Sequence, residues 1–152
     1  MNTDDIHGDN DVLDVSSYII NYCHANNISI TNLKLQKLLY FCEASYLIET
    51  HESSACFDEQ ILAWPYGPVV KSIYNMYSNF KNSEITVRPK LNSELKNEKV
   101  IETTLEVLSP YNAYVLAEMT HSHWPWIRAY KKGSNTIITK RSIYDYVTNS
   151  HH

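Results

Sequence analysis

The sequence predicts a mainly α-helical (α+β) fold, in which a single compact domain of about six helices carries a small two- or three-stranded β element. Glycine and proline are sparse, at 3 and 5 of 152 residues, which favours helices over a loop-rich β fold. Apolar residues make up 43% of the chain, enough to fill one sizeable core. The most regular stretches repeat their apolar residues at the spacing of a helix.

A flexible acidic lead is expected at residues 1–10, and the domain itself at residues 11–149. The first helix is expected over residues 11–25, where apolar side chains recur every three or four positions. Asp11 and Asp14 stand where carboxylates stabilise a helix N-terminus.

The second helix is the most periodic stretch of the chain and is expected from Thr31, as its N-cap, to residue 50. Its leucines define an apolar face, so this helix is expected to be central. The solvent-facing side is expected to carry three charged residues: Lys34, Lys37 and Glu43.

Two short strands are expected to follow, and they could pair with each other if helices cover them. The segment 57–64 ends in the apolar run Ile61-Leu62-Ala63-Trp64, which is typical of a buried strand, and residues 84–88 alternate in polarity. Between them, Pro68 suits the first turn of a helix that continues to about Phe80.

Three further helices are expected in the C-terminal half of the chain. One begins at Asn92 or Ser93 and ends near Leu108, and the next begins at once at Ser109-Pro110. The segment 124–126, Trp-Pro-Trp, is expected to be a short connection. Thr139 is the expected cap of the last helix.

Charge and cysteine content exclude several classes of protein. The net charge is −4, no dense block of Lys or Arg exists, and ten acids but two bases fall within residues 1–60, which argues against nucleic-acid binding. Three cysteines without a Cys-x-x-Cys pair fit a reducing compartment. The polar start lacks the features of a secretory signal, and no run of about 18 apolar residues exists. A cytoplasmic protein without a membrane span is therefore expected.

No catalytic, cofactor-binding or metal site is expected, and the chain is not expected to be an enzyme. The motifs of serine hydrolases, zinc proteases and phosphate-binding loops are absent. Cys23 and His24 are neighbours in the sequence but diverge by about 100° on a helix. His121 and His123 form one loose pair, whereas zinc sites usually show two close ligand pairs.

Two rigid elements rich in aromatic residues and proline, at residues 63–70 and 120–126, remain to be explained. Such elements either brace helices against the core or anchor a protein interface. Both interpretations stay open for their Trp and Tyr residues.

Three motifs follow one another along the chain. They are the stretch 30–41, ITNLKLQKLLYF; residues 56–70, CFDEQILAWPYGPVV, followed by Ser72-Ile73-Tyr74; and Thr120-His121, followed by residues 125–129, PWIRA. In this order and spacing they resemble the Panacea domain of SocA-like and GepA-like phage-associated antitoxins, and the resemblance covers about residues 12–147. Pro65 and Cys56 depart from the residues usual in the family.

The resemblance implies an antitoxin of a toxin–antitoxin system, which neutralises a protein toxin encoded by an adjacent gene by direct binding. The first candidates for toxin contact are Tyr66, Lys71, Tyr74 and Tyr77, because a helix from Pro68 would project them from a rigid corner. The motif residues expected to be structural are Leu35, Gln36, Lys37, Leu38, Tyr40, Trp64, Gly67, Pro68, Val69, His121 and Trp126.

Two alternatives remain beside this function. SocA-like members also act as adaptors that deliver a toxin to a protease, which would add a protease as a partner. A phage-associated regulator that binds DNA is the other alternative, against which the acidic N-terminal half argues. A homodimer also stays open.

Overall fold

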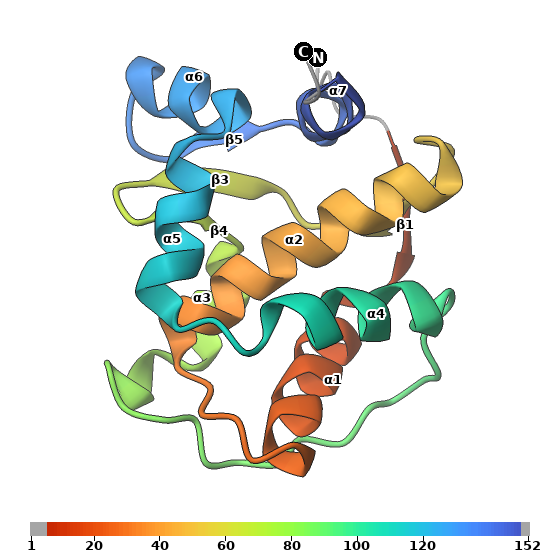
Figure 1. Cartoon of the computed structure of the whole chain (residues 1–152), viewed down its shortest axis with the longest axis vertical. Helices are drawn as coiled ribbons and strands as arrows, with labels where there is room; N and C mark the ends of the chain where they lie inside the picture. Colours follow the sequence, from red (N-terminus) through yellow and green to blue (C-terminus); the bar gives the residue numbers. More distant parts are fainter. Residues whose placement is uncertain (1–5, 150–152) are drawn as a thin grey trace.

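A central helix, α2, organises the chain in the computed structural model, which describes residues 6–149 (Figure 1). Other helices and both small sheets pack around it. Within the described residues there are seven α-helices, which confirms the helical α+β prediction and adds one helix to the expected number. Their bounds are α1 Val12–Ala25, α2 Asn32–Thr50, α3 Lys71–Met76, α4 Glu98–Leu108, α5 Ala113–His121, α6 Trp124–Lys132 and α7 Lys140–Asn149, with a 3-10 turn at Ser78–Phe80.

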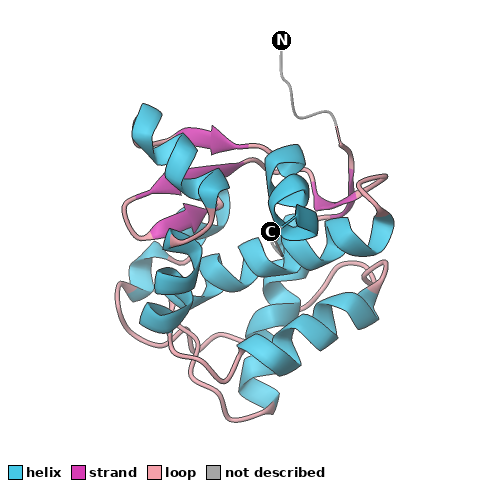
Figure 2. Ribbon diagram, turned by 45° about the horizontal axis from the view of Figure 1, so that its top comes forward, coloured by secondary structure: helices cyan, strands magenta, loops and turns pink. Residues whose placement is uncertain are grey.

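The strands form two separate sheets (Figure 2). In one, β1 (Gly8–Asn10) pairs in parallel with β2 (Ala55–Phe57). In the other, β3 (Ile61–Trp64) lies between β4 (Gly67–Val69) and β5 (Thr136–Ile138), antiparallel to both. The flexible lead expected at residues 1–10 is wrong for residues 8–10, because they form β1; residues 1–5 lie outside the described part of the chain.

The predicted caps of the first, second and last helices are confirmed. The Asp11 side chain accepts from the N–H of Leu13, and the Thr31 side chain accepts from the N–H of Lys34. The N–H of Ser142 donates to Oγ1 of Thr139 at the start of α7. Caps are local, so they can be recognised without the tertiary structure.

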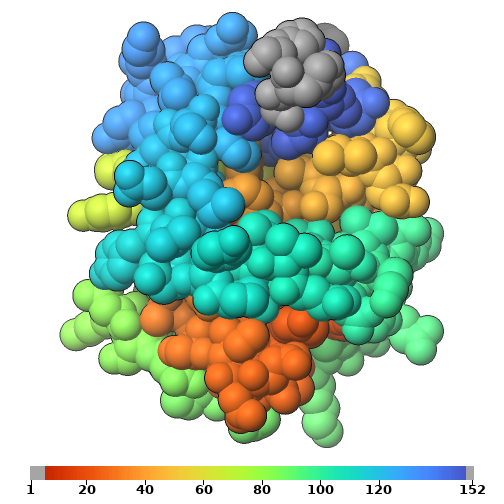
Figure 3. Space-filling view, in the orientation of Figure 1, coloured from red at the N-terminus to blue at the C-terminus, as the bar shows by residue number. Residues whose placement is uncertain are grey.

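The solvent-facing side predicted for α2 is wrong. All three of its charged residues are buried: Lys34, Lys37 and Glu43. The reason is that α2 is covered on several sides, by α1, α4, α5, α7, β2 and β4. Figure 3 shows part of this cover, where α4 crosses one face between α1 and the C-terminal half of α2.

The pairing predicted between Ile61–Trp64 and residues 84–88 is also wrong. The partner of β3 is β4, which follows after the two-residue turn Pro65-Tyr66. Residues 84–88 form no strand beyond one isolated bridge between Glu84 and Thr31. A tight turn brings two adjacent segments together at a lower entropic cost than a loop over residues 65–83 would.

The helix predicted from Pro68 begins three residues later, at Lys71, because Pro68 belongs to β4. A proline cannot donate to a sheet, but β4 is an edge strand of its sheet, where this is tolerated. The helix then ends at Met76 and a 3-10 turn replaces its expected last turn.

The starts predicted for the next helices need correction. α4 begins at Glu98 and not at Asn92 or Ser93, since the N–H of Asn92 donates to Asp14 (2.7 Å) and that of Lys96 to Asn10 (2.7 Å). Ser109 ends α4, and α5 is capped by Asn112. Residues 124–126 are no connection, because they form the first turn of α6, in which Pro125 lacks only an N–H that would have no partner there.

Candidate functional site

The β3–β4 hairpin ends in an exposed two-residue turn, which we call the hairpin tip: Pro65 and Tyr66. Tyr66 is 67% exposed, and both neighbouring strand residues, Trp64 and Gly67, are paired with each other. Gly67 has φ +111°, a conformation that side-chain-bearing residues rarely adopt. A tyrosine on so short a turn has little conformational freedom left to lose on binding.

Two side chains of α2 bind the backbone of β4 and of Val70, the residue that follows it. The ammonium of Lys37 donates to the carbonyl of Pro68 (Nζ–O 2.7 Å). Gln36 accepts from the N–H of Val70 (2.9 Å) and donates to Asn32 (3.0 Å). Side chains of the first motif, residues 30–41, therefore support the second motif, residues 56–70.

At Gly67 the hairpin lies close to side chains of both α2 and α5. A Cβ atom on Gly67 would lie 2.6 Å from Oγ1 of Thr120 and 3.1 Å from Nζ of Lys37. Any side chain there would displace both supports, so a glycine is required for packing as well as for its backbone angle.

The third motif holds the other side of the hairpin. Nε2–H of His121 donates to the carbonyl of Pro65 (3.1 Å), and the indole N–H of Trp126 donates to that of Trp64 (2.9 Å). The rings of His121 and Trp126 stack on each other with their centroids 4.3 Å apart. The indole N–H of Trp64 donates to Asn135 (2.6 Å). For these Trp residues the structure supports bracing of the hairpin.

The remaining motif residues expected to be structural lie in or beside the core. All are buried: Leu35, Leu38, Tyr40, Pro68 and Val69. The hydroxyl of Tyr40 is hydrogen-bonded to Nδ1 of His123 (2.8 Å), and burial lowers the pKa of His123 to about 4.

Lys37 carries an ammonium that is removed from water without a carboxylate beside it. Its side chain is fully buried, and no ion pair involves it among residues 6–149. Burial lowers its pKa to about 7, because the charged form is poorly solvated there.

The four contact candidates do not all reach the surface. Tyr66 and Lys71 are exposed, and Tyr74 is half-buried with its ring edge-on to Trp64 (5.0 Å between centroids). Tyr77 is only 5% exposed and lies in the core, so its ring offers almost no surface to a partner, contrary to the prediction.

A surface groove beside the hairpin tip contains a residue that sequence reasoning missed, Tyr114. It is 71% exposed, and it lines three adjacent cavities, one of about 280 Å³ that also reaches Tyr66 and Tyr74. The spacing of Leu116, Ala117 and Thr120, which are buried, defines the inner face of α5, and Tyr114 lies outside that face.

The groups considered for chemistry have separate structural roles. His121 and His123 are bonded to different partners, Pro65 and Tyr40, and no group of three or more His, Cys, Asp or Glu within residues 6–149 could hold a metal. The three cysteines are buried free thiols. No helix in the described part of the chain is long and apolar enough to span a membrane.

Comparison with known proteins identifies one family. The model of the family described as "Antitoxin SocA-like, Panacea domain" matches residues 35–127. The match includes the hairpin and the side chains that hydrogen-bond to its backbone, which are Gln36, Lys37, His121 and Trp126. No curated protein and no solved structure matches the chain significantly. The matched residues make up more than half of the sequence, so the chain belongs to the SocA-like antitoxin family with a Panacea domain.

Proposed function

We propose that this protein is an antitoxin that neutralises a co-encoded protein toxin by binding it directly, without catalysing a reaction. The observation that carries the proposal is the family membership together with the use of the family motifs, which immobilise a hairpin that presents Tyr66. Exposed aromatic residues on a rigid support are typical anchors of protein interfaces.

The proposed contact surface consists of Tyr66, Lys71, Tyr74 and Tyr114. It combines the hairpin tip with the groove that begins beside it. A stable and specific grip needs on the order of 1,200–2,000 Å² of buried surface. The hairpin tip alone is too small for that, so the toxin is expected to extend along the groove.

Co-expression with the product of the neighbouring gene tests this function. We expect that product to stop growth when expressed alone, and the present chain to restore growth and co-purify with it. A neighbouring product that is harmless alone, or that stays toxic beside this chain, would refute the proposal.

Single substitutions locate the contact surface. Tyr66→Ala and Tyr114→Ala are each expected to weaken toxin binding by roughly 30-fold, as loss of an interface anchor does. Val107→Ala is the matched control, because Val107 is 62% exposed on α4 and lies outside the proposed surface. Calorimetry with the purified toxin would measure all three.

A further inference from the structure

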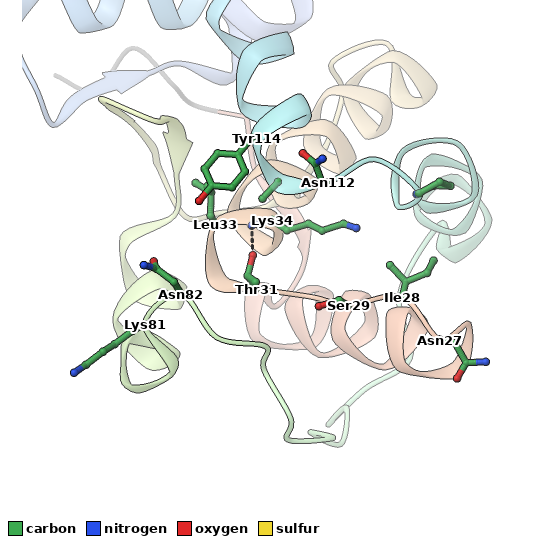
Figure 4. A pocket seen from close by; sticks show the side chains of 12 residues that line it. Asn27, Ile28, Ser29, Thr31, Leu33, Lys34, Lys81, Asn82, Asn112 and Tyr114 are labelled. Carbon is green, nitrogen blue, oxygen red and sulfur yellow. Dashed lines mark hydrogen bonds between the residues drawn. The ribbon is translucent and has the colours of Figure 1, made fainter.

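A cavity of about 470 Å³ continues the groove beyond Tyr114, and we call it the Lys34 pocket. Its lining includes Thr31 and Lys34 at the start of α2, Lys81 and Asn82 after the 3-10 turn, and Asn112 and Tyr114 at the start of α5. Figure 4 shows that the Lys34 side chain passes below Asn112 and ends on the side away from Tyr114, whereas Lys81 stands at the rim and points outwards.

The lining carries positive charge and no negative charge. It contains two lysines and neither Asp nor Glu, although the chain as a whole has a net charge of −4. The neighbouring cavity beside Tyr66 shares Lys81, Asn82, Leu33 and Tyr114 and also lacks an acid. A group that is complementary to this surface is therefore an anion.

The ammonium of Lys34 has few hydrogen-bond partners. The residue is 6% exposed, and the one hydrogen bond of its ammonium among the described residues goes to the carbonyl of Ser109 (2.6 Å). An ammonium has three donors, and no carboxylate of residues 6–149 forms an ion pair with Lys34. Burial lowers the pKa of Lys34, and an anion beside the ammonium would oppose that shift.

We propose that the Lys34 pocket receives an acidic side chain, Asp or Glu, of the toxin. This inference rests on the proposed function, since the pocket and the hairpin tip lie on one continuous groove. A segment of the toxin that covers Tyr66 and passes Tyr114 would place its carboxylate against Lys34. The pocket thus selects toxins that carry a negative charge at this position, while the tyrosines supply apolar contact.

Lys34→Met tests the pocket in the complex, because methionine keeps much of the side-chain length and removes the charge. We expect it to weaken toxin binding by about 30-fold or more, as loss of one partner of a desolvated charge pair does, and to reduce the salt dependence of binding. Lys90→Met is the control, since Lys90 is exposed on a segment that lines neither cavity. Equal affinity of Lys34→Met and wild type, or an equal loss in Lys90→Met, overturns the proposal while leaving the antitoxin function intact.

NMR of the free protein tests the pocket without the toxin. Blocked glutamate (N-acetylglutamate N-methylamide) is expected to shift the side-chain signals of Lys34 saturably and to raise its pKa, whereas blocked glutamine is not. Lys90 serves as the internal control. Absence of a saturable shift, or a shift with inorganic phosphate but not with blocked glutamate, overturns the assignment of a carboxylate. Because this result does not depend on the neighbouring gene, it separates failure of the pocket from failure of the antitoxin function.

Discussion

Position 67 requires glycine for two reasons: its backbone has a positive φ angle, and no space is left for a side chain. Gly133 provides a comparison within the same chain, because its φ of +141° is also unfavourable for other residues but its nearest neighbour to a Cβ would lie 3.9 Å away. The two glycines therefore differ in packing and share the backbone constraint.

Gly67→Ala is expected to destabilise the fold more than Gly133→Ala. Both substitutions incur backbone strain of about 1–3 kcal/mol. Gly67→Ala also drives a methyl group against Thr120 and Lys37, which adds roughly 1–3 kcal/mol. Urea unfolding of both variants measures the difference, and equal free energies of unfolding would show that the close packing at Gly67 is unimportant.

The buried Lys37 is expected to make stability rise with pH above neutrality. Its pKa is about 7 in the folded protein and 10.5 in an ordinary setting, so the unfolded chain binds more protons between these values. The free energy of unfolding then increases as the pH rises, by up to about 1.4 kcal/mol per unit. Urea unfolding from pH 7 to 9 should show this increase in wild type and in the exposed control Lys90→Met. A curve of the same slope in Lys37→Met would contradict the assignment to Lys37.

Sequence reasoning succeeded for residues with local signals and failed for residues whose partners are distant. Trp64, Gly67 and Trp126 have the structural roles that the motif pattern predicts. Lys34 and Lys37 were placed in solvent because a lysine on a helix is usually exposed. The acceptors of their ammonium groups are carbonyls 75 and 31 residues away, which no periodicity reveals.

At the scale of elements, a buried ion pair joins the last helix to the middle of the chain. Nζ of Lys140, at the start of α7, lies 2.6 Å from Glu43 of α2 and 2.5 Å from the carbonyl of Phe57 in β2. Glu43 also accepts from the N–H of Cys56 (2.6 Å). Burial raises the pKa of Glu43, and the Lys140 ammonium and the backbone N–H groups oppose that shift. The pair therefore ties α7, α2 and β2 together.

A double-mutant cycle measures the interaction free energy between Lys140 and Glu43. Lys140→Met alone is expected to destabilise the protein by about 3–5 kcal/mol, because it leaves the Glu43 carboxylate buried without its counter-ion. Adding Glu43→Gln removes that charge and should recover part of the loss. Additive losses in the double variant, measured by urea unfolding, would show that the two groups do not interact energetically.

Helices with a cap and a long period could be predicted from the sequence, and so could β3, whose bounds are those of the apolar run Ile61–Trp64. The other short strands could not. α1, α2 and α7 begin where Asp11, Thr31 and Thr139 predict. β5 consists of three residues, Thr136–Ile138, and exists because β3 offers its free edge. A strand of this length has no signal of its own, since its stability comes from the partner strand.

At the scale of the whole molecule, segments outside the family match complete the fold. α1 precedes the matched residues 35–127, and β5 and α7 follow them. β5 extends the sheet of the hairpin, and α1 and α7 pack against α2. The surface proposed for the toxin thus rests on a core to which segments on both sides of the matched residues contribute.

His123 precedes α6 and lies between α2 and α7, and it is expected to make the whole fold sensitive to acid. Its ring contacts Tyr40 and Phe41 of α2 and Tyr146 of α7, with centroids 5.6, 5.8 and 4.3 Å away. Burial lowers its pKa from 6.5 to about 4, so the folded protein keeps the ring neutral while the unfolded chain takes up a proton. Stability is therefore complete above pH 6.5 and is lost progressively as the pH falls towards 4. Thermal unfolding between pH 7 and 4.5 should show a steeper decline in wild type than in His123→Gln, with the exposed His7→Gln as the control that keeps the wild-type decline. Parallel curves for wild type and His123→Gln would mean that other groups govern the acid response.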